Sequence, residues 1–139
     1  MAENHQISEE TDKIRTVRIL ICGSRNWSNK KRIGDYLDIL IDHEGYLPEN
    51  ITIISGACKG ADHHAAMEAR GRGMVVIEYP ANWTKYGYSA GPKRNQQMLD
   101  EGKPDWVVAF HEDIESSKGT RDMVARSRFI NLPIEIITS

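Results

Sequence analysis

The sequence predicts an α/β fold, in which a doubly wound parallel sheet of about five strands carries helices on both faces of one domain. Five short runs rich in valine and isoleucine have the length and composition of strands. Segments with helical periodicity separate these runs, so the strands are expected to pair in parallel. Glycine-containing turns follow the runs that end at residues 22 and 54, as expected where a strand leads into a helix.

Length and composition are those of one soluble domain. The 139 residues are 40% hydrophobic and 27% charged, with a formal net charge of −2, which is ordinary for a globular protein. This charge argues against non-specific attachment to duplex nucleic acid or an anionic membrane, and it leaves room for a small basic pocket. No apolar run approaches the roughly 20 residues needed to cross a bilayer, and no signal peptide is recognisable. We therefore expect a cytoplasmic protein with no membrane partner.

Cysteine and histidine usage argues against a metal centre. The two cysteines, Cys22 and Cys58, form neither a disulfide framework nor a C-x-x-C pair. Reduced thiols in small buried or turn positions are the expectation for a cytosolic protein. No set of histidines and cysteines has the spacing of a zinc site. We therefore expect no metal site and no cofactor.

The first strand and the first helix follow a polar segment. Residues 1–16 are acid-rich and have no apolar periodicity, which predicts a disordered tail before a folded domain at 17–139. Residues 17–22 form an apolar run typical of a strand covered on both faces. The turn Gly23-Ser24-Arg25 ends this strand, and Ser28 is the expected N-cap of a helix that runs to about residue 43.

The second strand leads into a turn that suits an anion. Residues 51–54 are a β-branched run, Ser55 and Gly56 break it, and Gly60 precedes an alanine-rich helix at 61–70. At the start of such a helix the backbone N–H groups lack intrahelical partners, and the helix dipole adds partial positive charge. A phosphate group is therefore stabilised there. The spacing is neither that of the dinucleotide fingerprint nor that of the phosphate loop.

Several charged side chains near these turns have two interpretations each. Lys59 either adds a positive charge for a phosphate or extends into water. Asp62 lies in the first turn of its helix, where a carboxylate either accepts from a sugar hydroxyl or only complements the dipole. Arg25, and Arg94 beside Lys93, either bind a phosphate or belong to solvated surfaces.

The second half of the chain continues the alternation of strands and helices. Residues 80–91 form an unusually long segment that is aromatic, contains glycine and has no periodicity. Its Trp83, Tyr86 and Tyr88 either stack on a base or pack the loop against the body or a second subunit, and Trp27 has the same ambiguity. The other expected elements are a strand at 74–79, a helix at 92–101, a strand at 105–110, a polar loop at 111–118, a helix at 119–129 and a strand at 133–138.

The turns that follow parallel strands are expected to meet at one edge of the sheet. Right-handed crossovers place the carboxyl ends of the strands on the same edge, and ligands of such sheets bind there, where the strand order reverses. The turns expected at this edge are Gly23-Ser24-Arg25, Ser55-Gly56, Phe110-His111 and Gly119-Thr120.

Five short motifs in a fixed order carry a resemblance to a known family. They are Gly23-Ser24-Arg25 with Trp27, Ser55-Gly56-Ala57 with Gly60-Ala61-Asp62, Pro80-Ala81-Asn82-Trp83, Gly91-Pro92-Lys93-Arg94-Asn95 with Met98, and Gly119-Thr120. Together they resemble the SLOG superfamily, which includes the Smf/DprA and LONELY GUY proteins, and especially its YpsA-related branch. The resemblance spans residues 17–137. It implies a Rossmann-like fold that binds nucleotides or ligands derived from them.

The resemblance also implies an enzymatic alternative. LONELY GUY-type members are phosphoribohydrolases, which cut an N-glycosidic bond to release a free base, and an arginine and an acid carry their function. By motif position these residues are Arg94 and Asp122. Two features depart from the enzymes: residues 111–118 replace the P-G-G half of the P-G-G-x-G-T turn, and aspartate replaces glutamate at position 122. Acidic residues in this loop repel an anion, so the departures weigh against catalysis more than against binding.

One principal hypothesis and two alternatives follow. We expect a sensor or sequestering protein that binds a phosphorylated ribonucleoside, or a nucleotide-derived small molecule, at the carboxyl edge of the sheet. The alternatives are a phosphoribohydrolase-like enzyme and a single-stranded DNA binder, against which the near-neutral charge argues. By resemblance, a dimer or higher homo-oligomer is expected. The expected ligand-binding residues are Gly23, Ser24, Arg25, Ser55, Gly56, Lys59, Gly60, Asp62, Trp83, Lys93, Arg94, Asn95, Gly119 and Thr120, with Arg94 and Asp122 catalytic in an enzyme.

Overall fold

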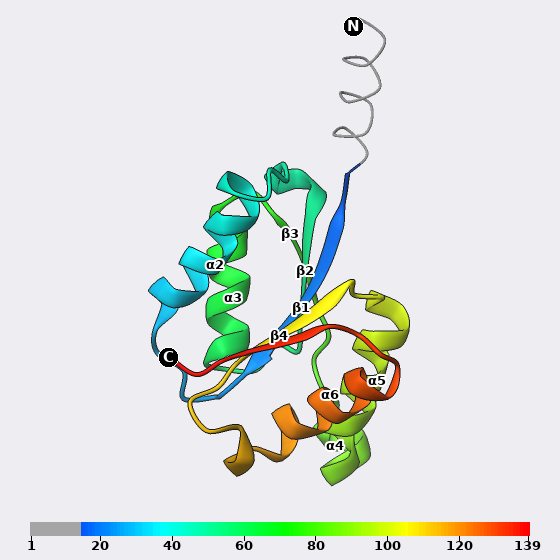
Figure 1. Cartoon of the computed structure of the whole chain (residues 1–139). Coiled ribbons are helices and arrows are strands. Elements are labelled where there is room, and N and C mark those ends of the chain that lie inside the picture. The colour runs from blue at the N-terminus through cyan, green and yellow to red at the C-terminus, as the bar shows by residue number, and fades with distance from the viewer. Residues whose placement is uncertain (1–14) are drawn as a thin grey trace, which may run out of the picture.

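The computed structural model describes residues 15–139, and its five strands form one parallel sheet (Figure 1). The strand order is β3-β2-β1-β4-β5, which confirms the predicted doubly wound α/β fold. Every pair of neighbouring strands is parallel, because a helical connection carries the chain back between consecutive strands. The strands are β1 (Val17–Gly23), β2 (Ile51–Ser55), β3 (Val75–Glu78), β4 (Trp106–Phe110) and β5 (Ile134–Ile137).

The order of the strands reverses at β1. From β1 the chain adds β2 and then β3 on one side, returns across the sheet, and adds β4 and β5 on the other side. At the end of β1, Gly23 pairs with Phe110 at the end of β4. The carboxyl ends of these two strands therefore lie side by side, while their connections leave in opposite directions. Such a switch point opens a crevice in which ligands of α/β sheets bind.

Helices cover both faces of the sheet, as predicted (Figure 1). One face carries α2 (Lys30–Asp42) and α3 (Ala61–Gly71), and the other carries α5 (Ala90–Gly102) and α6 (Lys118–Phe129). Single turns of 3-10 helix lie in the connecting segments, at Pro48–Asn50, Gly87–Ser89 and Ile114–Ser116.

Strand β1 contributes to both hydrophobic cores. Its Ile19 and Ile21 pack in the core of α2 and α3, whereas Leu20 and Cys22 pack in the core of α5 and α6. Successive side chains of a strand point to opposite faces, so a strand covered on both sides has to be apolar throughout. This explains the uninterrupted apolar run in the sequence, in which Arg18 is the exception.

The N-cap of α2 is Asn29 and not Ser28, so that prediction is wrong by one residue. The Asn29 side chain accepts a hydrogen bond from the Arg32 amide at 3.1 Å. The backbone carbonyl of Asn29 also accepts a hydrogen bond from the Trp27 indole nitrogen at 2.9 Å. Trp27 is 4% exposed and packs edge-on against Phe110 with ring centroids 5.6 Å apart. The buried tryptophan therefore fixes which polar residue faces the helix start, and it belongs to the core.

Replacing Asn29 with alanine is expected to lower the free energy of unfolding by about 1 kcal/mol, because the Arg32 amide loses its acceptor. The matched control is Ser28→Ala, which removes an exposed hydroxyl that makes no cap bond and is expected to change stability by less than about 0.5 kcal/mol. Urea denaturation of the two variants checks this. Equal losses in both variants would contradict the assigned cap.

Residues 80–91 are more regular than the sequence indicates, and the expectation of a long loop without regular structure is wrong. They contain the short helix α4 (Trp83–Tyr86) and a 3-10 turn, and α5 begins at Ala90, two residues earlier than expected. The Asn82 side chain caps α4 by accepting from the Lys85 amide at 3.0 Å. Residues 82–89 are all exposed. Helical periodicity reports a buried face, so a helix that buries almost nothing leaves no such pattern.

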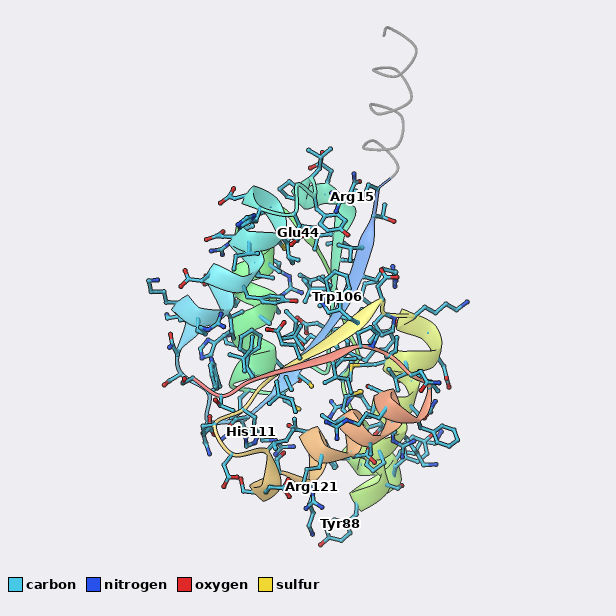
Figure 2. All side chains as sticks on the ribbon, viewed as in Figure 1. Arg15, Glu44, Tyr88, Trp106, His111 and Arg121 are labelled. Carbon is cyan, nitrogen blue, oxygen red and sulfur yellow. The ribbon has the colours of Figure 1, made fainter. Side chains whose placement is uncertain are left out.

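The polar segment expected at 1–16 lies almost wholly outside the described residues. At its end, Arg15 stacks over the Tyr46 ring with its guanidinium carbon 4.0 Å from the ring centroid, and it donates to the Glu44 carbonyl at 2.5 Å. Figure 2 shows Arg15 and Glu44 together at the end of the molecule where β1 begins. Within residues 15–139, no helix has the length and apolar character needed to cross a bilayer.

Candidate functional site

A cavity of about 670 Å³ opens at the carboxyl edge of the sheet, beside the ends of β1 and β4. We call it the edge pocket. Its walls come from the turn after β1, the start of α3, the segment around α4, the first turns of α5, the loop after β4 and the first turn of α6. Figure 2 shows His111 at this end of the sheet, with Arg121 and Tyr88 farther out at the same end of the molecule.

The edge pocket brings together most of the sequence-predicted site residues, but the turn after β2 contributes little to its lining. The predicted residues that line the pocket are Gly23, Ser24, Arg25, Asp62, Trp83, Arg94, Asn95, Gly119, Thr120 and Asp122. The predicted residues outside its lining are Ser55, Gly56, Lys59, Gly60 and Lys93. Of these, both lysines are exposed.

The turn after β2 packs against the turn after β1 and uses its own amides. Gly60 has a φ of 77°, and a Cβ built there would lie 2.3 Å from the Ser24 carbonyl oxygen. The Ala61 amide donates to that carbonyl at 2.9 Å. The Cys58 amide donates to the Asp62 carboxylate at 3.3 Å. Some of the backbone amides that were expected to bind a phosphate therefore donate to acceptors within the protein. The main role of this turn is to support the turn after β1, which lines the pocket.

Arg94 is buried in the pocket wall, with 9% of its surface exposed. Its Nη1 donates to the Gly56 carbonyl at 2.5 Å, and its Nε donates to the Asn95 side chain at 3.1 Å. Nη2 makes no hydrogen bond with residues 15–139, and no fully enclosed side-chain nitrogen of this part of the chain lacks a partner. Nη2 therefore reaches the open surface, which for this residue is the edge pocket.

Asp62 lies close to this arginine and is 5% exposed. Burial raises the pKa of its carboxyl from 3.8 to about 6, while the Cys58 amide and the charge of Arg94 act in the opposite direction. Burial also raises the pKa of the Cys22 thiol, and the Asp62 charge adds to this effect. Cys22 is therefore an inert thiol, as the sequence indicated.

The buried Asp62 carboxyl is expected to make stability depend on pH. Because its pKa is about 6 in the folded state and 3.8 as the reference value, the folded state retains a proton that the unfolded state has lost between these values. Stability should therefore fall as pH rises through this window, by about 2–3 kcal/mol, and then level off. Urea denaturation from about pH 4 to pH 8, compared with Asp62→Asn, checks this. A wild type and variant with parallel pH profiles would contradict it.

Asn95 joins α5 to α6 across the pocket wall. Its Nδ2 donates to the Gly119 carbonyl at 3.2 Å and to Oδ2 of Asp122 at 3.0 Å. The Arg126 guanidinium donates to the same carboxylate oxygen at 2.8 Å. Arg94, Asn95 and Asp122 thus form a hydrogen-bonded row that holds the Asp122 carboxylate in one position.

The first turn of α6 presents donors to the edge pocket. Ser117 caps the helix by accepting from the Thr120 amide at 3.1 Å. The amides of Lys118 and Gly119 have no intrahelical partner, because they lie in the first turn, where the helix dipole adds partial positive charge. The exposed Lys118 also lines the pocket. This part of the wall favours an anionic group.

Glu112 places negative charge in the pocket wall, beside the turn after β1. Its Oε1 accepts from the Ser24 hydroxyl at 2.6 Å, and this hydrogen bond lowers the pKa of the Glu112 carboxyl. The Ser24 hydroxyl in turn accepts from the Asn26 amide at 3.0 Å. A phosphate is repelled by this carboxylate, so the start of α6 suits a phosphate better than the turn after β1.

The aromatic residues around α4 differ in their relation to the pocket. Trp83 is 47% exposed, lines the pocket and lies against the start of α5, where a Cβ built on Gly91 would be 3.2 Å from its ring. The Arg25 guanidinium carbon lies 6.0 Å from the Trp83 ring centroid. Tyr88 is fully exposed at the pocket margin. A half-exposed indole at the mouth of a pocket provides a flat face for a base.

Comparison with known proteins identifies the family. Residues 17–86, half of the chain, match the model of the YspA, cpYpsA-related SLOG family. The chain belongs to this SLOG family. The matched part contains the turns after β1 and β2, α3 and Trp83, and it ends before α5 and α6. The resemblance stated from the sequence motifs is thereby confirmed.

Two further proteins are similar to this SLOG domain. The Gene 61 protein of Mycobacterium phage D29 is 29% identical over an alignment of 122 residues that covers 84% of this chain and 93% of that protein. DNA processing protein A (DprA) from Streptococcus pneumoniae has a similar structure, with a TM-score of 0.61 and 16% identity over 90% of this chain. At that identity the likeness shows the fold alone. This chain spans about half of the DprA chain, 51% of its length.

Sequence reasoning missed several residues that line the pocket of this SLOG domain. Ser117 carried a usable signal, since a serine just before a glycine-threonine helix start is a standard N-cap. Glu112 was expected to repel an anion, but nothing in the sequence indicated its hydrogen bond with Ser24, because the two residues are 88 positions apart. Among residues 15–139, no group of three or more histidine, cysteine, aspartate or glutamate side chains is placed to hold a metal ion.

Proposed function

We propose that this SLOG domain binds a phosphorylated ribonucleoside, or a small molecule derived from a nucleotide, in the edge pocket, and acts as a sensor or sequestering protein without turnover. The observation that carries the proposal is the cavity of about 670 Å³ at the switch point between β1 and β4, where a helix start, cationic side chains and an exposed indole meet. Its volume lies in the range of small-molecule sites.

The proposal assigns the parts of the ligand to the parts of the wall. The first turn of α6 binds the phosphate through the Gly119 amide and the Lys118 side chain. Asn95 and Arg126 hold one oxygen of the Asp122 carboxylate. The carboxylate is thereby fixed in position, and it accepts a hydrogen bond from a ribose hydroxyl. Trp83 covers the base at the pocket mouth.

The hydrogen-bonded row supports a second candidate, a phosphoribohydrolase-like enzyme. Arg94 and Asp122 lie in the same pocket and are joined through Asn95. Cleavage of an N-glycosidic bond needs a group that stabilises positive charge developing on the ribose, and a fixed carboxylate can serve. The binding proposal ranks first because two nitrogens of Arg94 already donate to protein acceptors. This arrangement fits a residue that supports the pocket wall better than one that acts on a substrate.

Native mass spectrometry of the freshly purified protein tests the proposal most directly, since a bound small molecule reveals its mass. Titration with AMP, GMP, CMP and UMP, followed by tryptophan fluorescence, then measures affinity. Chromatography of the same mixtures detects any released base. Binding without base supports the sensor, whereas base release that Asp122→Asn abolishes supports the enzyme.

A third part of this experiment uses a single-stranded oligonucleotide, because the structurally similar protein is named DNA processing protein A. Binding of single-stranded DNA that weakens steeply with salt, together with no response to any mononucleotide, would overturn the proposed function. Trp83→Phe keeps an aromatic face at the mouth of the pocket and is expected to retain mononucleotide affinity within about threefold.

A further inference from the structure

His111 follows β4 directly and has no role in the function proposed so far. Its backbone amide donates to the Ile137 carbonyl at the end of β5 at 2.9 Å, so the last residues of two strands hold it in place. Only 5% of its surface is exposed, and it lines the edge pocket. Figure 2 shows it where β4 ends, at the ligand-binding edge of the sheet.

The hydrogen bond to one ring nitrogen fixes the chemistry of the other. Nδ1 of His111 accepts from the Asp113 amide at 2.9 Å. A nitrogen that accepts carries no proton, so the proton of the neutral ring is on Nε2. His111 is therefore a hydrogen-bond donor at Nε2, and the loop after β4 keeps it in that tautomer.

Within the described part of the chain, nothing accepts this Nε2 proton. The nearest carboxylate in sequence, Glu112, has its Oε1 engaged by the Ser24 hydroxyl. No fully enclosed side-chain nitrogen or oxygen of residues 15–139 lacks a partner, so Nε2 has to reach the open surface. The surface that His111 contributes is the edge pocket. A buried residue thus directs an unused N–H into a cavity.

Thr120 shows the same feature in another part of the pocket wall. It is 4% exposed, lines the edge pocket and is in the first turn of α6. Its hydroxyl makes no hydrogen bond with any residue from 15 to 139, although its backbone amide is capped by Ser117. Two buried side chains from separate elements therefore direct unused donors into one pocket, beside the amides of the α6 start. A phosphoryl group, with several acceptor oxygens, matches this set of donors.

We propose that His111 is a ligand-binding residue, whose Nε2–H donates a hydrogen bond to a phosphoryl oxygen of the nucleotide bound in the edge pocket. The inference rests on the proposed function and adds a phosphate-binding residue to it. At the end of β4, where the glycine-rich turn of the enzymes would supply amides, His111 supplies a side-chain N–H as the donor.

Two substitutions separate the two ring nitrogens. In His111→Asn the amide oxygen can replace Nδ1 as the acceptor for Asp113, but the side chain is too short to reach the pocket as Nε2 does. In His111→Gln the terminal amide nitrogen reaches the position of Nε2. We expect His111→Asn to weaken binding of the best nucleoside monophosphate by about tenfold or more, and His111→Gln to retain affinity within about threefold. Thermal unfolding of both variants serves to check that they fold.

Nitrogen-15 NMR of the histidine side chains gives a readout that a purely structural role would not move. His111 is assigned by its absence from the His111→Asn spectrum. The Nε2–H tautomer is expected without ligand, and addition of the nucleoside monophosphate, or of inorganic phosphate alone, is expected to shift the Nε2 resonance. The unphosphorylated nucleoside is the matched control and should leave this resonance unmoved.

The outcomes distinguish this inference from the proposed function. If nucleoside monophosphates bind but the His111 resonance stays in place and His111→Asn binds as well as the wild type, the inference is overturned while nucleotide binding stands. If inorganic phosphate shifts the resonance and no nucleotide binds, His111 stands as a phosphate-binding residue, whereas the nucleotide as its ligand and the proposed function are overturned. If neither probe moves the resonance and neither binds, both are overturned.

Discussion

Replacing Gly60 with alanine is expected to lower the free energy of unfolding by about 4 kcal/mol or more, through backbone strain and a steric clash together. Gly60 has a φ of 77°, where a residue with a Cβ is strained. The added Cβ would lie 2.3 Å from the carbonyl oxygen of Ser24 and 2.5 Å from that of Arg25. These are backbone atoms of the turn after β1, so they can move aside only if the two turns separate.

Urea denaturation measures this loss, and tryptophan fluorescence with a nucleoside monophosphate measures the ligand affinity of the same variant. The matched control is Gly71→Ala at the end of α3, where a Cβ meets nothing within 4 Å, and which is expected to change stability by less than about 1 kcal/mol. If the two variants lost similar stability, the close packing of the turns after β1 and β2 would be refuted.

Replacing Arg94 with methionine is expected to lower stability by about 3–5 kcal/mol near pH 8, because it removes a buried charge on which neighbouring groups depend. The Gly56 carbonyl loses a donor at 2.5 Å. The Asp62 carboxyl loses a cation that holds its pKa down, so its pKa is expected to rise further above 6. The folded state then retains the Asp62 proton to higher pH, and stability falls over a wider range of pH.

The loss in Arg94→Met is therefore expected to be larger near pH 8 than near pH 4, where Asp62 is largely protonated in the folded state. Urea denaturation at both pH values checks the sign. Lys93→Met is the matched control on the preceding residue: Lys93 is exposed and lies outside the pocket lining, so a change of less than about 0.5 kcal/mol is expected at either pH. A pH-independent loss in Arg94→Met would show that Arg94 and Asp62 are not coupled.

The succession of elements was predictable because the three central strands, β1, β2 and β4, bury both faces and each main helix buries one. The apolar run at 17–22 and the helical spacing of apolar residues before residue 43 report burial directly, and both segments are buried in the structure. Where burial is absent, the prediction was wrong: α4 buries almost nothing and is held by the Asn82 cap. The N-cap of α2 was misplaced by one residue because the buried Trp27 decides which side chain faces the helix start.

The position of the edge pocket could be predicted from the sequence, but the contacts within its wall could be predicted only in part. Gly23, Ser24 and Arg25 line it, as do Gly119 and Thr120, because parallel strands with right-handed crossovers bring their following turns to one edge. The spacing around Gly60 suggested a phosphate cradle, yet the Ala61 amide is engaged by the Ser24 carbonyl. The same local sequence supports either role, and the neighbouring turn decides between them.

By itself, the sequence determined the fold class, the family and the edge of the sheet at which a ligand is expected, because these depend on local periodicity and on short motifs. Only the tertiary structure decided which polar groups are already engaged and which remain available to a ligand. Arg94 reaches Gly56 across 38 positions and Ser24 reaches Glu112 across 88, and packing of distant segments makes such contacts. For the same reason the unused Nε2–H of His111 became visible only when its surroundings were known.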